Sequence, residues 1–552
     1  CRSFHLGAAF GMKAVFRVDA SSRMGIGHFM RCLTLAEALR QRGADIRFVC
    51  RAHVGHMIDT LTHAAIPVTV LPTPIKAADA AEDYAAWLGV TQDADAAETI
   101  EALKGDKPDW LIVDHYGLDA QWEQALRPHV GKLLVIDDLA NRPHDCDVLL
   151  DQNYSTDAEA RYQNLVPAGC RRLLGPRYAL LRPEYAAFRK TLAPRDGQVH
   201  RVLVFFGGSD PANVTGMALE ALSTPELREL QVDVVAGANN PHRKTIEQQV
   251  SQRPLTTLHE PRPHLADLMA QADVSLGAGG ATTWERLCLG LPSLVVSIAE
   301  NQIPACESLA ESRLINYLGP VSILQSEQIR HGVLTMVNDA HALMDLSSRG
   351  HTLVDGFGTQ RLAEQIDPTS SEQLRLRPAQ QEDTALYFGW VNETEVRRQS
   401  LNRDPIPWQA HQEWFRSKLA DPHCRLLVLE AGTLPVGQIR FDIERDEARI
   451  DYSLDPLVRG RHWAAKLITM GARMVQDSLP VALRAEAKEA NQASCAVFIR
   501  LGFIEQASPP RGMRVFRSQS SRIAAVDSTP ICPTSLFSTD SEQSTRCCGH
   551  TP

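Results

Sequence analysis

The stretch RVDASSRMGIGHFMRCLTLA (17–36) decides the fold of the first part of the chain. A β-branched run ends at Asp19, a turn of small residues with Gly25 and Gly27 follows, and His28 opens an amphipathic segment. Glycines let a backbone turn tightly and approach a ligand, so this order predicts a strand, a ligand-binding turn and a helix. Further apolar runs alternate with helical stretches and predict a buried parallel sheet; they lie at 45–50, 67–71, 109–114, 132–137 and 147–151.

A second unit of the same kind follows. RVLVFFGGSD (201–210) and ADVSLGAGG (272–280) are predicted strands that end in glycine turns, and PSLVVSI (292–298) is a further strand. Two α/β halves joined by a crossing segment predict a pair of Rossmann-like domains with a ligand-binding cleft between them. After about residue 374 the pattern changes to that of a smaller α+β domain.

Composition excludes several classes of protein. The 552 residues are 44% hydrophobic and 22% charged, which excludes wholesale disorder, and the net charge of −9 argues against a general nucleic-acid binder. The apolar run at 291–299 is far shorter than the roughly 20 residues of a membrane span. The twelve cysteines are scattered without a CxxC pair, which favours reduced thiols. We therefore expect a cytoplasmic protein with no nucleic-acid or membrane partner.

His28 is the candidate catalytic group of the first unit. In the first helical turn it meets the positive end of the helix dipole, which disfavours the protonated imidazole and leaves a base able to accept a proton. Asp19, Gly25 and Gly27 are expected to contact the ligand with it. The alternative is a tight strand–helix turn with a partly exposed histidine. Asp114, Asp137 and Asp138 also follow predicted strands, where they either orient groups in the cleft or cap the backbone.

The second unit carries the candidate nucleotide site. Its glycine turns feed helices and are suited to hold a diphosphate, and Glu285 is placed to accept hydrogen bonds from ribose hydroxyls. The ENQ segment after the strand at 292–298 offers donors and acceptors for a sugar or uracil. No metal-ligand cluster stands out, so no metal is expected. The predicted binding residues of this unit are Gly208, Ser209, Gly279, Gly280, Ala281, Thr282, Glu285, Glu300, Asn301 and Gln302.

Residues 12–366 resemble the UDP-2,4-diacetamido-2,4,6-trideoxy-β-L-altropyranose hydrolases of bacterial pseudaminic acid biosynthesis. These hydrolases are similar to GT-B glycosyltransferases but transfer the sugar to water. The resemblance implies a GT-B-like fold, His28 as catalytic base, and a UDP-sugar held by the segments AGGATTWE and ENQ. The motifs that carry it are the stretch 17–36, IVDHYGLD (112–119), VIDDLANRPHDCDVLLDQN (135–153), FFGGSDPAN (205–213) and AGGATTWERLCLGLPSLVVSIAENQ (278–302).

The C-terminal domain resembles the GNAT acyl-CoA N-acetyltransferases through DYSLDPLVRGRHWAAKLI (451–468) and AEAKEANQASCAVFIRLGFIE (485–505). The resemblance implies that a splayed strand holds pantetheine and that the following loop holds the pyrophosphate of acetyl-CoA, the co-substrate. The implied acetyl-CoA residues are Ser453, Leu454, Arg459, Gly460, Arg461, His462, Trp463, Ala464, Asn491 and Ser494.

Two residues depart from the GNAT pattern. His462 stands where the pyrophosphate loop has glycine, and Phe498 stands where a tyrosine often serves as general acid. His462 either crowds the phosphate or donates to it. The leaving thiolate then takes its proton from water or another group, and Phe498→Tyr is expected to speed transfer.

We therefore expect a bifunctional enzyme. The GNAT domain would acetylate the 4-amino group of a UDP-sugar, and the GT-B-like part would hydrolyse the anomeric bond with inversion, releasing UDP and free sugar. The alternatives are a glycosyltransferase that uses the same cleft, a non-catalytic nucleotide-sugar sensor with an inert GNAT domain, or acetylation of a protein N-terminus or an antibiotic.

The predicted organisation has six parts. We expect residues 1–11 to be an artefactual leader before Met12 and residues 518–552 to be a disordered tail. Between them lie an N-terminal Rossmann-like domain (12–190), a UDP-sugar-binding Rossmann-like domain (195–366), a linker (367–373) and the GNAT domain (374–517).

Overall fold

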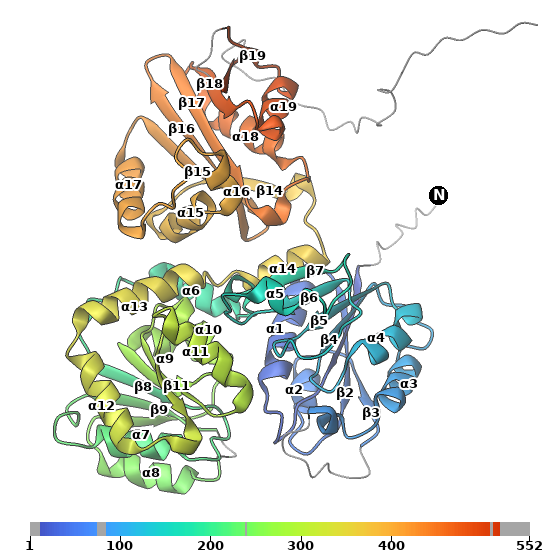
Figure 1. Ribbon diagram of the computed structural model, residues 1–552, viewed down its shortest axis with the longest axis vertical. Helices are drawn as coiled ribbons and strands as arrows, with labels where there is room; N and C mark the ends of the chain where they lie inside the picture. The colour runs from blue at the N-terminus through green and yellow to red at the C-terminus, as the bar shows by residue number, and fades with distance from the viewer. Residues whose placement is uncertain (1–10, 74–83, 238–239, 508–511, 519–552) are drawn as a thin grey trace, which may run out of the picture.

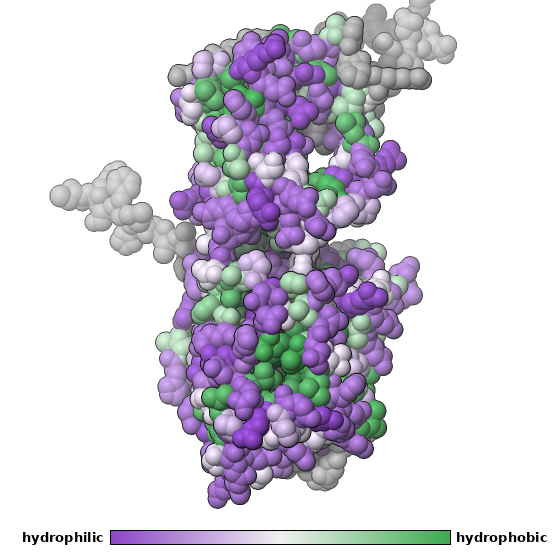
Figure 2. Space-filling view, turned by 90° about the vertical axis from the view of Figure 1, so that its left-hand side faces the viewer, coloured by the Kyte–Doolittle hydropathy of each residue, from purple (hydrophilic) through white to green (hydrophobic). Residues whose placement is uncertain are grey.

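The computed structural model describes residues 11–73, 84–237, 240–507 and 512–518. The predicted leader, apart from Gly11, and the predicted tail, apart from Ser518, lie outside these ranges. Figure 1 shows two α/β units side by side in the lower half of the molecule and a third unit above them. Figure 2 shows a mostly hydrophilic surface with an apolar patch on the lower part and a narrow waist beneath the upper unit.

The first unit is a seven-stranded, wholly parallel sheet with the order β3-β2-β1-β4-β5-β6-β7. This order reverses direction between β1 and β4, as in doubly wound nucleotide-binding folds. The strands are β1 (Lys13–Val18), β2 (Asp45–Arg51), β3 (Val68–Leu71), β4 (Trp110–Asp114), β5 (Lys132–Ile136), β6 (Val148–Asp151) and β7 (Arg171–Leu174). The helices are α1 (Gly27–Gln41), α2 (Ile58–His63), η1 (Tyr84–Leu88), α3 (Gln92–Ala102), α4 (Ala120–Leu126), η2 (Arg127–His129), α5 (Ala158–Arg161) and η3 (Pro176–Tyr178).

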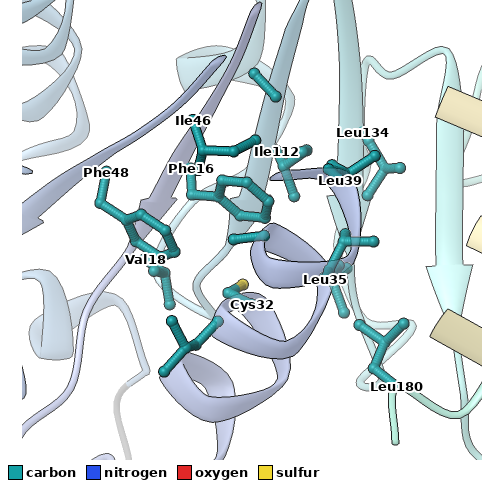
Figure 3. Packing of buried hydrophobic residues seen from close by; sticks show 14 of the residues in the cluster. Phe16, Val18, Cys32, Leu35, Leu39, Ile46, Phe48, Ile112, Leu134 and Leu180 are labelled. Atoms are coloured by element: carbon teal, nitrogen blue, oxygen red, sulfur yellow. The ribbon is translucent and has the colours of Figure 1, made fainter. Parts of the chain in front are cut away.

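The core of the first unit fixes the position of α1. Phe16 of β1 stacks on Phe48 of β2 with ring centroids 4.8 Å apart, and both are fully buried. Cys32, Leu35 and Leu39 of α1 pack on this surface (Figure 3). Because the apolar face of α1 is held against the sheet, its first turn is fixed at the carboxyl edge of β1.

The second unit is a six-stranded parallel sheet with the equivalent order β10-β9-β8-β11-β12-β13. Its strands are β8 (Arg201–Phe205), β9 (Gln231–Val235), β10 (Thr256–His259), β11 (Val274–Ala278), β12 (Ser293–Ser297) and β13 (Asn316–Pro320). Its helices are α7 (Val214–Leu222), α8 (Arg243–Gln252), α9 (Ala266–Gln271), α10 (Thr282–Cys288), η4 (Glu300–Gln302), α11 (Ile303–Glu311), η5 (Val321–Ile323), α12 (Ser326–Val337) and α13 (Ala340–Leu353).

Two helices cross between the units and correct the predicted domain boundaries. Helix α6 (Pro183–Thr191) falls, except for its last residue, in the range predicted for the first domain, but its Tyr185 is buried in the core of the second. Helix α14 (Gly358–Ile366) falls in the range predicted for the second domain, but its Leu362 and Ile366 are buried in the core of the first. Their apolar faces, and not their place in the chain, decide where they pack.

The third unit is a mixed sheet with the order β14-β15-β16-β17-β18-β20-β19. Its strands are β14 (Leu374–Pro378), β15 (Cys424–Ala431), β16 (Leu434–Glu444), β17 (Glu447–Leu454), β18 (Ala482–Lys488), β19 (Ile504–Glu505) and β20 (Met513–Arg517). Its helices are η6 (Ser371–Gln373), η7 (Gln381–Asp383), α15 (Thr384–Val391), α16 (Thr394–Gln399), α17 (Trp408–Ala420), η8 (Pro456–Val458), α18 (Trp463–Gln476) and α19 (Gln492–Arg500). In the described part of the chain, no helix combines the length and the apolar character needed to cross a bilayer.

Candidate functional site

The first site lies at the carboxyl ends of β1, β4 and β5, beside the point where the strand order reverses. His28 is in the first turn of α1, Asp114 is the last residue of β4, and Asp138 lies two residues beyond β5. Parallel strands bring these residues to one edge although 110 positions separate the first from the last in the sequence. Asp114 and Asp138, two of the carboxylates noted after predicted strands, therefore lie together at this edge.

His28 and Asp114 form a directly hydrogen-bonded pair. Nδ1 of His28 lies 2.6 Å from Oδ1 of Asp114, and the histidine side chain is 13% exposed whereas the carboxylate is fully buried. Burial of Asp114 opposes its ionisation, but Arg31 and His28 outweigh this and hold the pKa of the carboxyl well below its usual range. An ionised carboxylate at this distance only accepts, so Nδ1 must carry the proton. Nε2, the other ring nitrogen, is left without this partner.

Arg31 ties this pair to a second carboxylate. Its Nε donates to Oδ2 of Asp114 at 2.6 Å, its Nη2 donates to Oδ1 at 2.7 Å, and its Nη1 donates to Asp138 at 3.1 Å. The fork holds both carboxylates in fixed positions, as a bidentate guanidinium does. Asp114 is thereby held from one side by Arg31 and presents Oδ1 to His28.

Tyr116 links the His28 site to the second unit. Its ring meets the His28 ring edge-on with centroids 4.5 Å apart, and its hydroxyl donates to Asp138 at 2.5 Å. Across the interface, Nδ2 of Asn301 donates to the same hydroxyl at 3.2 Å. Burial and the nearby Asp138 raise the pKa of Tyr116 well above its usual value, so the phenol stays protonated at neutral pH. The ENQ segment and His28 thus lie on facing sides of one interface.

Asp19 departs from its predicted role in ligand binding. Its side chain is fully buried, where it accepts from Nη1 of Arg17 at 2.7 Å and from the backbone N–H of Arg51 at 2.7 Å. A carboxylate enclosed in this way joins β1 to β2 and does not reach a substrate. Asp137 is likewise buried and accepts from the backbone of Ala140, which fits the capping alternative.

The turn between Asp19 and His28 keeps the predicted form. Gly25 has a φ of +74°, a conformation that favours glycine, and the space beside Gly25 and Gly27 is free of neighbours within 4 Å. A backbone with this open space lets a ligand approach His28 closely.

The glycine turn after β8 offers less to a diphosphate than predicted. Gly208 and Ser209 are exposed. However, Asp210 accepts from the backbone N–H groups of Val214 at 2.9 Å and Thr215 at 2.8 Å. Because these are first-turn donors of α7, the end of that helix is already neutralised by a carboxylate. The turn can contribute the exposed loop backbone but not the helix end.

The loop after β11 lies beside the ENQ segment. Gly279 packs against Gln302 and Cys306, and Gly280 lies near Nε2 of Gln302. Gln302 accepts from the backbone of Ile298 at 3.0 Å, which fixes the segment. Ala281 and Thr282 follow at the start of α10, Glu300 is exposed, and the structure therefore gathers the predicted residues 279–282 and 300–302 in one neighbourhood.

Glu285 lies in the first turn of α10 and has an unusual ionisation. Burial raises the pKa of its carboxyl to about 7, and Tyr185, Arg286 and Arg182 only partly offset this. A ribose hydroxyl that donates to Glu285 requires the carboxylate form. If Glu285 holds the ribose as the sequence predicts, its protonation would control nucleotide affinity near neutral pH.

We expect Glu285→Ala to weaken UDP binding by about 10- to 100-fold, because a hydrogen bond to a charged group contributes about 1.5–3 kcal/mol. In the native protein, UDP affinity should level off above pH 7 and fall as the pH drops below 7, since protonation removes the acceptor. Calorimetry from pH 5.5 to 8.5 measures both effects. Glu285→Gln is the matched control, because the diphosphate still titrates in that variant whereas residue 285 does not. If the pH profile of UDP affinity in Glu285→Gln were identical to that of the native protein, the assignment of Glu285 would be contradicted.

The GNAT unit carries the second site, at a splay between two parallel strands. β17 and β18 pair only from Glu447↔Ala482 to Ile450↔Ala485, although β17 continues to Leu454 and β18 to Lys488. Ser453 and Leu454 therefore lie on the unpaired side of the splay, as predicted for backbone that receives pantetheine. Gly460 has a φ of +81°, and a Cβ added to it would meet no neighbour within 4 Å, so the loop has room for a phosphate.

The two arginines of this loop hold carboxylates. Nη2 of Arg459 donates to Glu393 at 2.5 Å, and Nη1 of Arg461 donates to Glu364 of α14 at 2.5 Å. Glu364 is fully buried and also accepts from Arg42, at the end of α1, at 2.7 Å. The loop predicted to bind pyrophosphate thus also anchors the GNAT unit to the first unit.

The remaining predicted acetyl-CoA residues differ in whether they are accessible to a co-substrate or buried in the domain core. Ala464 is partly exposed, and Asn491 caps α19 by accepting from the backbone of Ser494 at 3.1 Å. Trp463 corrects the prediction: it is 3% exposed and packs in the domain core, so it supports the loop and does not contact the co-substrate.

Phe498 is also enclosed. It is 2% exposed and lies between Phe503 and Phe516, with ring centroids 5.3 and 5.6 Å away. A hydroxyl added there would be buried among apolar rings, at a cost of about 1–3 kcal/mol if unpaired. The expectation that Phe498→Tyr speeds transfer loses its basis.

His462 adopts the left-handed conformation, with a φ of +60°, directly before α18. This explains why glycine is favoured at that position, since the conformation costs a residue with a Cβ about 1–2 kcal/mol. We expect His462→Gly to raise the melting temperature and to tighten acetyl-CoA binding by removing an exposed side chain from the loop. Thermal unfolding and calorimetry measure the two effects.

Arg445→Gly is the matched control for this substitution. Arg445 also has a left-handed φ, of +56°, but lies in the turn between β16 and β17. Its replacement should raise stability without changing acetyl-CoA affinity. Weaker binding in His462→Gly would show instead that the imidazole is a phosphate ligand.

Three features of the His28 site escaped the sequence interpretation: Arg31, Tyr116 and the pairing role of Asp114. Arg31 is three positions after His28, a spacing that places both on one helix face and could have indicated the contact. Tyr116 lies within the DHY segment of the quoted motif IVDHYGLD, where only the motif itself pointed to it.

Among the described residues, no cluster of three or more His, Cys, Asp or Glu side chains is arranged to hold a metal ion. Two open cavities lie at the edge strand β13, lined by Tyr317, Leu318 and Gly332 among others, and none of the predicted site residues lines either of them.

Comparison with known proteins places both parts of the chain. Residues 373–504 match the family model of the acetyltransferase (GNAT) domain, which confirms the GNAT resemblance. The chain is 26% identical over 301 residues to UDP-2,4-diacetamido-2,4,6-trideoxy-beta-L-altropyranose hydrolase from Campylobacter jejuni, covering 54% of this chain and 97% of that protein. An uncharacterized protein from Methanocaldococcus jannaschii is 21% identical over 502 residues, covering 89% of this chain and 96% of the relative.

Among solved structures, MurG from Acinetobacter baumannii is similar with a TM-score of 0.46 and 14% identity, covering 64% of this chain and 99% of the MurG chain. The resemblance to a hydrolase of this kind, fused to a GNAT domain, is confirmed by the sequence relatives. The observed strand orders give the predicted fold class, a GT-B-like pair of Rossmann-like units followed by a GNAT domain.

Proposed function

We propose that the GT-B-like part hydrolyses a UDP-linked 2,4-diacetamido-2,4,6-trideoxy sugar at its anomeric carbon, releasing UDP and the free sugar for pseudaminic acid biosynthesis. The observation that carries this proposal is the His28–Asp114 pair, in which Nδ1 is engaged at 2.6 Å and Nε2 is left for a substrate or water. The similarity to a named hydrolase supports the choice of substrate.

The residues of the first site supply base catalysis. Nε2 of His28 accepts a proton from water as the water attacks the anomeric carbon from the face opposite UDP. Oδ1 of Asp114 holds the Nδ1 proton and stabilises the imidazolium that forms. UDP leaves as a stable anion, so no second acid is required, and the product has inverted configuration.

The second unit positions the nucleotide. Glu285 is placed for the ribose, the loop at 279–282 for the diphosphate, and the segment at 300–302 for the sugar or uracil. Asn301 reaches Tyr116 across the interface, which supports closure of the two units around the reacting bond. Closure of this kind excludes bulk water and leaves the water held by His28.

The GNAT domain is proposed to acetylate the 4-amino group of the preceding UDP-sugar. The splay at Ser453 and Leu454, together with the open loop at Gly460, fits an acetyl-CoA arm and its pyrophosphate. When bound, acetyl-CoA supplies an activated acetyl group. Acetylation first and hydrolysis second would give the two domains consecutive steps.

One incubation tests the whole proposal. The purified protein is mixed with the UDP-4-amino sugar, with and without acetyl-CoA, and products are followed by NMR and mass spectrometry. We expect acetylated free sugar and UDP only when acetyl-CoA is present. Sugar transfer that needs an added acceptor would establish a glycosyltransferase, and tight binding without turnover would establish a sensor.

A further inference from the structure

The GNAT unit has a hydroxyl pair at its splay, made of Ser494, which the sequence analysis named as an acetyl-CoA residue, and Tyr452, to which it gave no role. The hydroxyl of Tyr452 donates to Oγ of Ser494 at 3.1 Å. Tyr452 lies on β17 two residues beyond Ile450, where the pairing with β18 ends. Ser494 lies in the first turn of α19. The pair therefore joins the two elements that border the splay.

The pair also lies beside the position where the usual acid is missing. The ring of Tyr452 meets the ring of Phe498 edge-on, with centroids 5.9 Å apart. Phe498 is sealed in the core, whereas Tyr452 and Ser494 are both partly exposed. Residue 498 therefore supplies no proton at this end of the splay, whereas the partly exposed pair carries hydroxyl groups that can.

We propose that Tyr452 is the general acid of acetyl transfer, with Ser494 as the relay that returns its proton. This inference rests on the proposed acetyltransferase function of the domain. As the amine nitrogen bonds to the acetyl carbon, the carbon–sulfur bond breaks and its electron pair stays on sulfur. The Tyr452 hydroxyl gives its proton to that sulfur, and the amine loses its own proton to water.

The relay restores the acid after each turnover. The phenolate left on Tyr452 takes the Ser494 hydroxyl proton, and the serine takes one from water. Burial raises the pKa of Tyr452, with a smaller rise from Cys495 and a lowering by Ser494, so the phenol is protonated throughout the neutral range. Cys495 follows Ser494 on α19 and is itself buried.

The first measurement is binding, which does not depend on turnover. In the proposed role the Tyr452 hydroxyl turns from Ser494 to the sulfur and stabilises the thiolate of bound CoA. We expect Tyr452→Phe to weaken CoA binding several-fold above pH 8.5, where the free thiol ionises, and to leave the binding of desulfo-CoA unchanged at every pH. Calorimetry of both ligands from pH 7 to 9.5 tests this. Equal affinities of wild type and variant for CoA across that range would overturn the proposal.

The second measurement is the rate of a single turnover with the amine substrate. We expect Tyr452→Phe to slow it by about 10- to 100-fold, less than many acid–base residues because a thiolate leaves without full protonation. Ser494→Ala should slow it less, since water can replace the relay. A larger loss in Ser494→Ala, with Tyr452→Phe near wild type, would make the serine the direct donor and overturn the assignment.

Tyr387→Phe is the matched control. Tyr387 is a buried tyrosine of the same domain whose hydroxyl donates to the backbone of Leu427 at 2.9 Å, away from the splay. Its replacement should lower stability without changing the CoA-to-desulfo-CoA difference. If the 4-amino sugar is not acetylated but Tyr452→Phe weakens the binding of CoA and not of desulfo-CoA, the proposed acceptor is wrong and the assignment of Tyr452 is retained.

Discussion

Replacing His28 by asparagine is expected to slow UDP-sugar hydrolysis by about 10²–10⁴-fold, the usual contribution of a general base. The asparagine amide could still hydrogen-bond to Asp114, but it has no basic nitrogen to accept the proton of water. UDP affinity should remain within about threefold of wild type, because the nucleotide contacts are proposed for the second unit. Steady-state kinetics and calorimetry with UDP measure the two quantities.

The matched control for this substitution is His63→Asn. His63 is an exposed histidine at the end of α2 in the same unit, with Nδ1 2.6 Å from the backbone oxygen of Asp59. Its replacement should leave the rate unchanged. Near-wild-type hydrolysis in His28→Asn would remove the base assignment, whereas loss of UDP binding would show that the substitution disturbs the closed interface.

Replacing Asp114 by asparagine is expected to lower the rate constant of hydrolysis by about 10²–10⁴-fold, with little change in UDP affinity. The amide keeps the size of the side chain but not its charge, so it no longer fixes the Nδ1 proton of His28 or stabilises the imidazolium. The variant also loses stability, because Arg31 keeps only Asp138 as a charged partner. Thermal unfolding and steady-state kinetics separate the two effects.

Asp147→Asn provides the matched control for the loss of stability. Asp147 is ion-paired with Arg127 at 2.5 Å and accepts from the backbone of Leu133 at 2.7 Å, at the opposite end of β5 from His28. Its replacement should lower the melting temperature without lowering the rate. A rate loss in Asp114→Asn no greater than in this control would show that the carboxylate has only a structural role.

The interdomain anchor explains how the acetyltransferase unit is held near the GT-B-like part. Glu364 accepts from Arg42 of the first unit and from Arg461 of the GNAT loop, while Arg177 pairs with Asp455 at 2.9 Å. These pairs join segments that lie between 97 and 322 positions apart in the chain. Charge at single residues gave no sign of such pairing, because a salt bridge depends on which segments meet in the folded molecule.

Local patterns of residues were enough to predict the buried central strands, the three units and the place of His28 at the start of a helix, but not the edge strands β7, β10 and β13. These features follow from apolar periodicity, glycine turns and a histidine at a helix start, each of which acts within about 20 residues. The splayed strand of the GNAT unit followed from the resemblance to that family, whose motif is contiguous in the chain.

Packing between distant segments settled which polar groups meet and which are buried. Asp114 and Asp138 follow strands in the same way as Asp19, yet the first two meet Arg31 at the carboxyl edge of the sheet, whereas Asp19 is enclosed between β1 and β2. Tyr452 and Phe498 are both aromatic, yet the hydroxyl of Tyr452 lies at the splay, whereas the ring of Phe498 is enclosed in the core. Tertiary contacts decide which side chains are buried and which polar groups pair with one another, and no pattern of neighbouring residues encodes this.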